Sequence, residues 1–186
     1  MTPIYNAILD DSIDGIRLIS LVEEPAIHQS YICFNEVIKF SQDDDNHCLT
    51  GPILIPNYKV LRRDAQRGEY YIVFSEDTIE KIAAKMIREG TAANVDTNHN
   101  HQTEKGIYPI EVYFKDDKRN KLVGFEDLPD KTLFVTYKVE NEELYQKIKN
   151  DFTGFSVDAL VTLIPESQED TLAAILADLK KLKNVR

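Results

Sequence analysis

The 186-residue sequence contains 42% hydrophobic and 29% charged residues, a balance typical of one folded domain with its own core. Its formal net charge of −10 argues against a protein whose main task is to grip nucleic-acid phosphates, because such proteins need a basic surface. Two cysteines cannot make a disulfide framework, and no apolar run approaches the roughly 20 residues of a membrane span, so we expect a soluble intracellular protein.

The first half of the chain predicts short strands and one helix. Strands are expected where β-branched and aromatic residues alternate or cluster between turn residues. These segments are residues 5–11, 15–27, 31–40, 52–56 and 68–74. The acidic run 41–47 is expected to be a solvated loop.

A helix is expected between Ser75 and Gly90. Ser75 is a suitable N-cap, and Gly90 suits the C-terminal stop. Apolar residues recur between them at helical spacing and predict one buried stripe. The stripe consists of Ile79, Ile82, Ala83, Met86 and Ile87.

The second half predicts four more strands and two helices, so the fold class is expected to be α+β or barrel-like rather than a Rossmann arrangement. The strands are residues 93–102, 107–114, 132–139 and 150–164, and the helices are residues 142–149 and 167–186. The last helix is amphipathic, acidic at its start and basic at its end, which matches the helix dipole.

A serine interrupts the apolar alternation of the last predicted strand. Side chains alternate across a strand, so Phe155 and Val157 share one face and Ser156 lies on the other. A serine hydroxyl is a weak nucleophile until a neighbouring imidazole takes its proton. Ser156 is therefore either an ordinary small strand residue or a nucleophile.

Two histidines and a glutamate are candidate partners for this serine. His99 and His101 share one face of the predicted strand 93–102, and Glu111 points away from the apolar side of strand 107–114. An imidazole works best as a general base when a third group orients it.

The same histidines have two other interpretations. A His-x-His pair on one strand face can bind Zn²⁺, with Asp96 and Glu104 nearby as further ligands. Plain surface histidines are the third possibility, and the spacing alone leaves all three open.

Four segments, in their order, resemble the XkdF-like phage prohead (capsid maturation) serine proteases. The segments are "YNAILDDSIDGIRLISLVEEPAI", "LTGPILIPNYKVLRRD", "GEYYIVFSEDTIEKIA" and "FTGFSVDALV", and the resemblance runs from Tyr5 to Ile164. This family is related to the HK97-type prohead proteases and distantly to the herpesvirus assemblins. The resemblance implies a herpesvirus-protease-like β-barrel core flanked by helices, with a protease domain over residues 1–165 and a C-terminal amphipathic helix over residues 166–186.

The resemblance also implies the roles of the candidate residues. The family nucleophile lies in "GFS", here Ser156, and the family histidine follows a run that matches "NVDTNH", here His99. The acidic residue of a following strand matches Glu111 in "PIEVYF". Assemblins use a second histidine as the third member, which makes His101 the alternative to Glu111.

The implied function is that of a serine endopeptidase inside the phage procapsid, in the host cytoplasm. Its expected substrates are the internal scaffold, the extensions of the major capsid protein and its own chain. We expect no cofactor and no binding to nucleic acid or membrane. We expect the protein to form a homo-oligomer. The alternatives are a non-catalytic protease-like capsid or scaffold component, and a metal-binding accessory protein that uses His99 and His101.

Overall fold

The structure is a computed structural model that describes residues 2–10, 12, 14–23, 39–119 and 122–166. These residues form a mixed α+β fold with two α-helices, α1 (Glu76–Glu89) and α2 (Glu142–Asp151), and the short 3-10 helix η1 (Thr91–Ala93). The strands are β1 (Ile4–Ile8), β2 (Gly15–Val22), β3 (Ser41–Asp43), β4 (Cys48–Leu54), β5 (Val60–Asp64), β6 (Gly68–Phe74), β7 (Val95–Thr97), β8 (Ile107–Phe114), β9 (Leu133–Val139), β10 (Gly154–Leu160) and β11 (Thr162–Pro165). The α+β prediction is thus confirmed.

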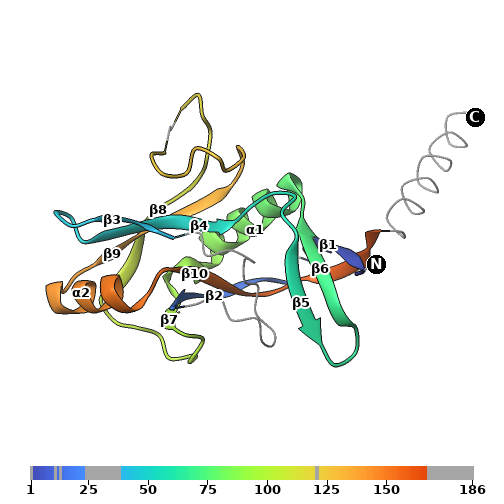
Figure 1. Cartoon of the computed structure of the whole chain (residues 1–186), viewed down its shortest axis with the longest axis horizontal. Coiled ribbons are helices and arrows are strands. Elements are labelled where there is room, and N and C mark those ends of the chain that lie inside the picture. The colour runs from blue at the N-terminus through green and yellow to red at the C-terminus, as the bar shows by residue number, and fades with distance from the viewer. Residues whose placement is uncertain (1, 11, 13, 24–38, 120–121, 167–186) are drawn as a thin grey trace, which may run out of the picture.

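The described strands pair into three sheets, with the orders β11-β1-β6-β5, β10-β2-β7 and β3-β4-β9-β8. Figure 1 shows the third sheet above β10 and β2, with α2 at one end of the molecule and the β5–β6 hairpin at the other. Pairing among the described strands leaves each sheet open, so they form no closed barrel.

All three sheets and both helices contribute to one hydrophobic core, part of which lies between the second and third sheets. Phe155 on β10 contacts Tyr137 on β9, with ring centroids 5.4 Å apart, and Phe40, at 5.5 Å. Both Tyr137 and Val157 are 0% exposed. The face of β10 that carries Phe155 and Val157 is therefore its core face, and Ser156 lies on the opposite face.

Helix α1 forms as its end signals predict. The Ser75 hydroxyl accepts the backbone N–H of Thr78 at 3.1 Å, and Gly90 closes the helix with φ of 71°. Ile79 and Met86 are buried in the core, but Ile87 is 60% exposed, so the buried stripe is narrower than predicted.

Several segments differ from the predictions. Strand β4 spans Cys48–Leu54 rather than residues 52–56, and β5 was not predicted. The segment 150–164 is not one strand: it divides into β10, which pairs with β2, and β11, which pairs with β1 in another sheet. The acidic run after Phe40 is not all loop, because Ser41–Asp43 pairs with β4 as a fully exposed edge strand. Exposure of every β3 side chain leaves no apolar pattern from which the pairing could be predicted.

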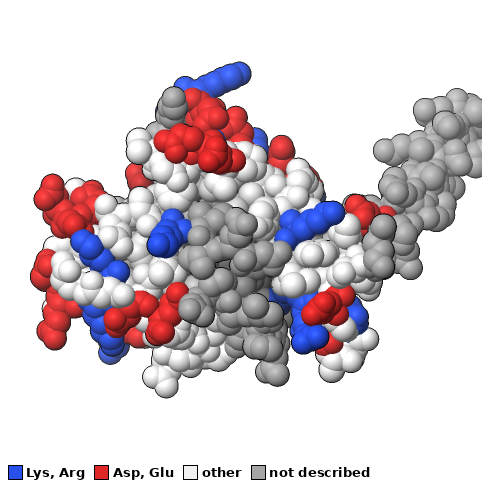
Figure 2. Space-filling model, viewed as in Figure 1, with Lys and Arg blue, Asp and Glu red and all other residues white. Residues whose placement is uncertain are grey.

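Acidic side chains gather on the visible surface at the α2 end and over the loops between β8 and β9, with basic side chains interspersed (Figure 2). No helix in the described part of the chain is long and apolar enough to cross a membrane. Most of the predicted strand 31–40 and the predicted helix 167–186 lie outside the described residues, as does Cys33; Cys48 is buried.

Candidate active site

Three polar residues stand in a row across the sheet β10-β2-β7. Ser156 on β10 is the register partner of Ser20 on β2, and Ser20 is the register partner of Asp96 on β7. Register partners project to the same face of a sheet, so the three side chains lie side by side. All three are buried, with exposed fractions of 1%, 0% and 0% in the same order.

The loop after β7 brings a histidine to this row. β7 ends at Thr97, and Asn98, His99 and His101 then have left-handed backbones with φ of 49°, 56° and 58°. The predicted strand 93–102 is therefore wrong beyond Thr97. Left-handed non-glycine residues are uncommon and cluster at functional sites.

Hydrogen bonds hold this loop against β2. The backbone N–H of Asn98 donates to the Leu21 carbonyl at 2.8 Å, and its side-chain amide donates to the Glu23 carboxylate at 2.8 Å. The backbone N–H of His101 donates to Oδ2 of Asp96 at 2.7 Å. The conformation that carries His99 is thus fixed on both sides of the histidine.

The His99 imidazole bridges the two serines of the row. Its Nε2 lies 3.0 Å from Oγ of Ser156, and its Nδ1 lies 2.8 Å from Oγ of Ser20. With the ring proton on Nδ1, the ring donates to Ser20 and leaves the Nε2 lone pair to accept the Ser156 proton. This is the arrangement that a general base and its nucleophile require.

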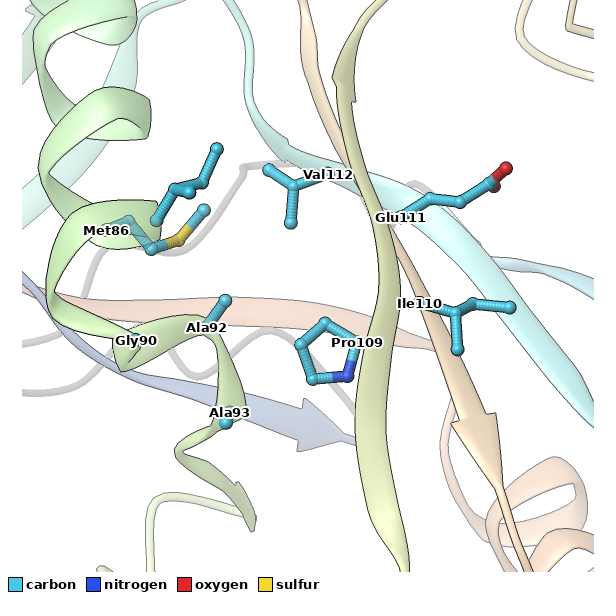
Figure 3. Close-up of a pocket in the computed structure, with 9 residues that line it drawn as sticks. Met86, Gly90, Ala92, Ala93, Pro109, Ile110, Glu111 and Val112 are labelled. Carbon is cyan, nitrogen blue, oxygen red and sulfur yellow. The ribbon is translucent and has the colours of Figure 1, made fainter.

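Glu111 lies elsewhere. It is on β8, in the third sheet, and its carboxylate accepts a hydrogen bond from the Thr136 hydroxyl at 2.9 Å. Figure 3 shows Glu111 pointing away from Met86 of α1, whereas Val112 points towards it, beside an apolar pocket of about 350 Å³. The structure therefore does not bring the predicted third member to the Ser156–His99 pair, and the Nδ1 position is taken by Ser20.

His101, the alternative third member, contributes its backbone N–H to the row, through the bond to Asp96. Glu104, a ligand of the alternative metal site, accepts a hydrogen bond from the Thr97 hydroxyl at 3.3 Å. Within the described ranges, no three His, Cys, Asp or Glu side chains are grouped so that they could hold a metal ion.

Comparison with known proteins identifies the family of the chain. The family model described as "Putative phage serine protease XkdF" matches residues 36–164, which include β7, the His99 loop and β10. The chain belongs to this family. No curated protein and no solved structure matches the chain.

Ser156 and His99 lie within the part of the chain that the XkdF family model matches. Ser20 lies before that part, which begins at residue 36. Sequence reasoning missed Ser20, although its setting in "LISLV" repeats that of Ser156 in "GFSVD": a serine between apolar residues of a strand. That shared pattern is the signal by which it could have been found.

The environment of His99 favours the neutral imidazole. Burial lowers the pKa of His99 below its ordinary value of 6.5. The carboxylates of Asp96 and Asp158 raise this pKa, and the charges of His101 and Arg62 lower it, but burial has the largest effect. A neutral ring is the form that can accept a proton from serine.

This lowered pKa predicts a pH dependence of stability. Between the folded pKa of His99 and the unfolded value of 6.5, only the unfolded chain binds the proton, so acidification through this window should lower the free energy of unfolding. Above pH 6.5 the group should contribute no slope. Urea unfolding at several pH values, with an NMR titration of His99, measures both effects. His99→Gln should remove this part of the slope; an unchanged slope in the variant would contradict the assignment.

Proposed function

We propose that the chain is a serine endopeptidase of phage capsid maturation, with Ser156 as nucleophile and His99 as general base. The observation that carries the proposal is the 3.0 Å contact between His99 Nε2 and Ser156 Oγ in a chain of a phage serine protease family. The proposed substrates are the internal scaffold, the extensions of the major capsid protein and the enzyme itself.

The chemistry follows from the pair. His99 Nε2 takes the Ser156 proton while Oγ forms a bond to the scissile carbonyl carbon. The resulting imidazolium gives the proton to the leaving amine as the C–N bond breaks, which leaves an acyl-serine. Water then loses a proton to His99 as its oxygen bonds to the acyl carbon. The C–Oγ bond breaks, His99 returns the proton to Ser156 Oγ, and the carboxylic acid product leaves.

Some features of the proposal rest on the family resemblance. They are a herpesvirus-protease-like arrangement of the strands, a peptidase domain over residues 1–165 with a C-terminal helix over residues 166–186, a homo-oligomer, and a location inside the procapsid in the host cytoplasm. Three sheets that share one core support the first of these.

One observation favours a second candidate function, that of a non-catalytic capsid or scaffold component. Ser156 is only 1% exposed, so a substrate carbonyl can reach its hydroxyl only after neighbouring groups move. A protein with a purely structural role has no need of that movement. The two functions differ in whether the Ser156 hydroxyl ever reacts.

Co-expression with the scaffold and major capsid proteins of the same phage tests the proposal. Intact-mass analysis should find discrete truncations of one or both proteins with the wild-type chain, and full-length masses with the Ser156→Ala chain. Sequencing the new termini then gives the cleavage site. Full-length masses in both cultures, with procapsids still assembled, would reject the peptidase and favour the structural component.

A further inference from the structure

The sheet supplies His99 with an unusual partner on its second ring nitrogen. In a conventional triad, Nδ1–H donates to a buried carboxylate, which fixes the tautomer and stabilises the imidazolium. Here a neutral hydroxyl, Ser20 Oγ, stands 2.8 Å from Nδ1. A hydroxyl can accept the proton and orient the ring, but it brings no negative charge.

A carboxylate that can supply this charge, Asp96, lies on the neighbouring strand β7 in the same row. Asp96 is the register partner of Ser20 and is 0% exposed. Its Oδ2 accepts the His101 backbone N–H, but in the described part of the chain its Oδ1 is buried with no hydrogen-bond partner. Buried polar atoms are nearly always paired, so an orphaned carboxylate oxygen beside the candidate site requires an explanation.

The hydroxyl proton of Ser20 links His99, Ser20 and Asp96. When Nδ1–H donates to Ser20 Oγ, the hydroxyl proton of Ser20 has to point to a different acceptor. Neighbouring strands lie about 4.8 Å apart and Oδ1 of Asp96 is unpaired among the described residues, so we infer that rotation of the Ser20 hydroxyl and of the Asp96 carboxyl lets the hydroxyl donate to Oδ1. The negative charge of Asp96 also favours the protonated form of His99.

We propose that Ser20 and Asp96 together take the place of the third triad member as positioning residues. The Ser20 hydroxyl accepts a hydrogen bond from Nδ1–H and so fixes the tautomer. Asp96 supplies the negative charge that stabilises the imidazolium through Ser20. This inference rests on the proposed peptidase function, but its first readout does not depend on activity.

The first test is the tautomer of His99, measured by proton–nitrogen correlation NMR of the intact chain. In the wild type, neutral His99 should carry its proton on Nδ1. In Ser20→Ala the acceptor is gone, and the ring should populate both tautomers. Asp158→Asn is the matched control, because Asp158 also acts on the charge of His99 but lies outside the Ser20–Asp96 pair. It should leave the tautomer unchanged.

The second test is kinetic and uses a peptide that spans the mapped cleavage site. Ser20→Ala should lower kcat by about 10- to 100-fold with little change in KM, since an orienting hydrogen bond is lost and no substrate contact changes. Asp96→Asn should lower kcat and move the acid limb of the kcat/KM profile to lower pH. The variant removes a negative charge that raises the pKa of His99, and leaves Asp158, which raises it, and His101 and Arg62, which lower it. Ser20→Thr, which keeps the hydroxyl, should restore most of kcat.

Specific results would overturn the inference. Wild-type kcat and a wild-type His99 tautomer in Ser20→Ala would remove Ser20 from the mechanism. A loss of kcat in Glu111→Gln with full activity in Ser20→Ala would return the third position to Glu111. If Ser20→Thr does not fold, the tautomer in Ser20→Ala decides. Absence of any cleavage by the wild type, with the Nδ1 tautomer present, would reject the peptidase function and leave the positioning geometry standing.

Discussion

Replacing Ser156 by alanine should lower turnover of a cleavage-site peptide by about 10⁴-fold or more, because no bond to the scissile carbonyl can then form. The midpoint of urea unfolding should fall only modestly, since His99 Nε2 loses a hydrogen-bond partner but the core face of β10 and its pairing with β2 are unchanged. Initial rates at saturating peptide and an unfolding curve measure the two quantities.

A fluorophosphonate reagent separates loss of the nucleophile from loss of binding. It should modify the wild type at Ser156, as mapped by peptide mass, and leave Ser156→Ala unmodified. Ser41→Ala is the matched serine control, because Ser41 lies exposed on β3, in a different sheet. It should keep wild-type turnover and labelling. Turnover by Ser156→Ala within tenfold of the wild type would remove Ser156 as the nucleophile.

Replacing the adjacent Phe155 by alanine should have the opposite profile. Phe155 is 5% exposed, and its ring contacts Tyr137 and Phe40. A β-carbon at Gly51 would come within 3.0 Å of this ring, so the ring lies closely against the β4 backbone. Truncation should leave a cavity and lower the free energy of unfolding by about 3–5 kcal/mol, which is a large part of the 5–15 kcal/mol of a typical domain.

Phe155→Leu provides the control for this prediction. Leucine refills most of the cavity, so its loss of unfolding free energy should be well below that of alanine. The fraction of Phe155→Ala that stays folded should still react with the fluorophosphonate at Ser156. A loss below 1 kcal/mol in Phe155→Ala would show that the ring does not pack in the core as described.

Local signals predicted what depends on neighbouring residues in the chain. Helix α1 followed from Ser75, Gly90 and the spacing between them, and the alternation around Ser156 correctly separated it from the core face of β10. The run "NHNH" carried a local signal that the strand prediction overlooked: asparagine tolerates the left-handed conformation, which ends β7 before His99.

Pairing between distant strands could not be predicted in the same way. Ser20 and Ser156 lie opposite each other only because β2 and β10 pair antiparallel in one particular register. A shift of one residue would turn every side chain of β10 to the other face. The position of Glu111 away from His99 has the same origin, since β8 pairs in the sheet of β9 rather than in that of β2.

The order in which β2, β7 and β10 are synthesised determines when Ser156 and His99 can come together. β2 and β7 are translated first and pair in parallel, and β10, with the nucleophile, is translated after both. A nascent chain that ends before residue 154 lacks Ser156. A longer chain must still pair β10 with the distant β2 before Ser156 lies beside His99. Translation itself therefore delays the assembly of the Ser156–His99 pair until nearly all of the described strands have been synthesised.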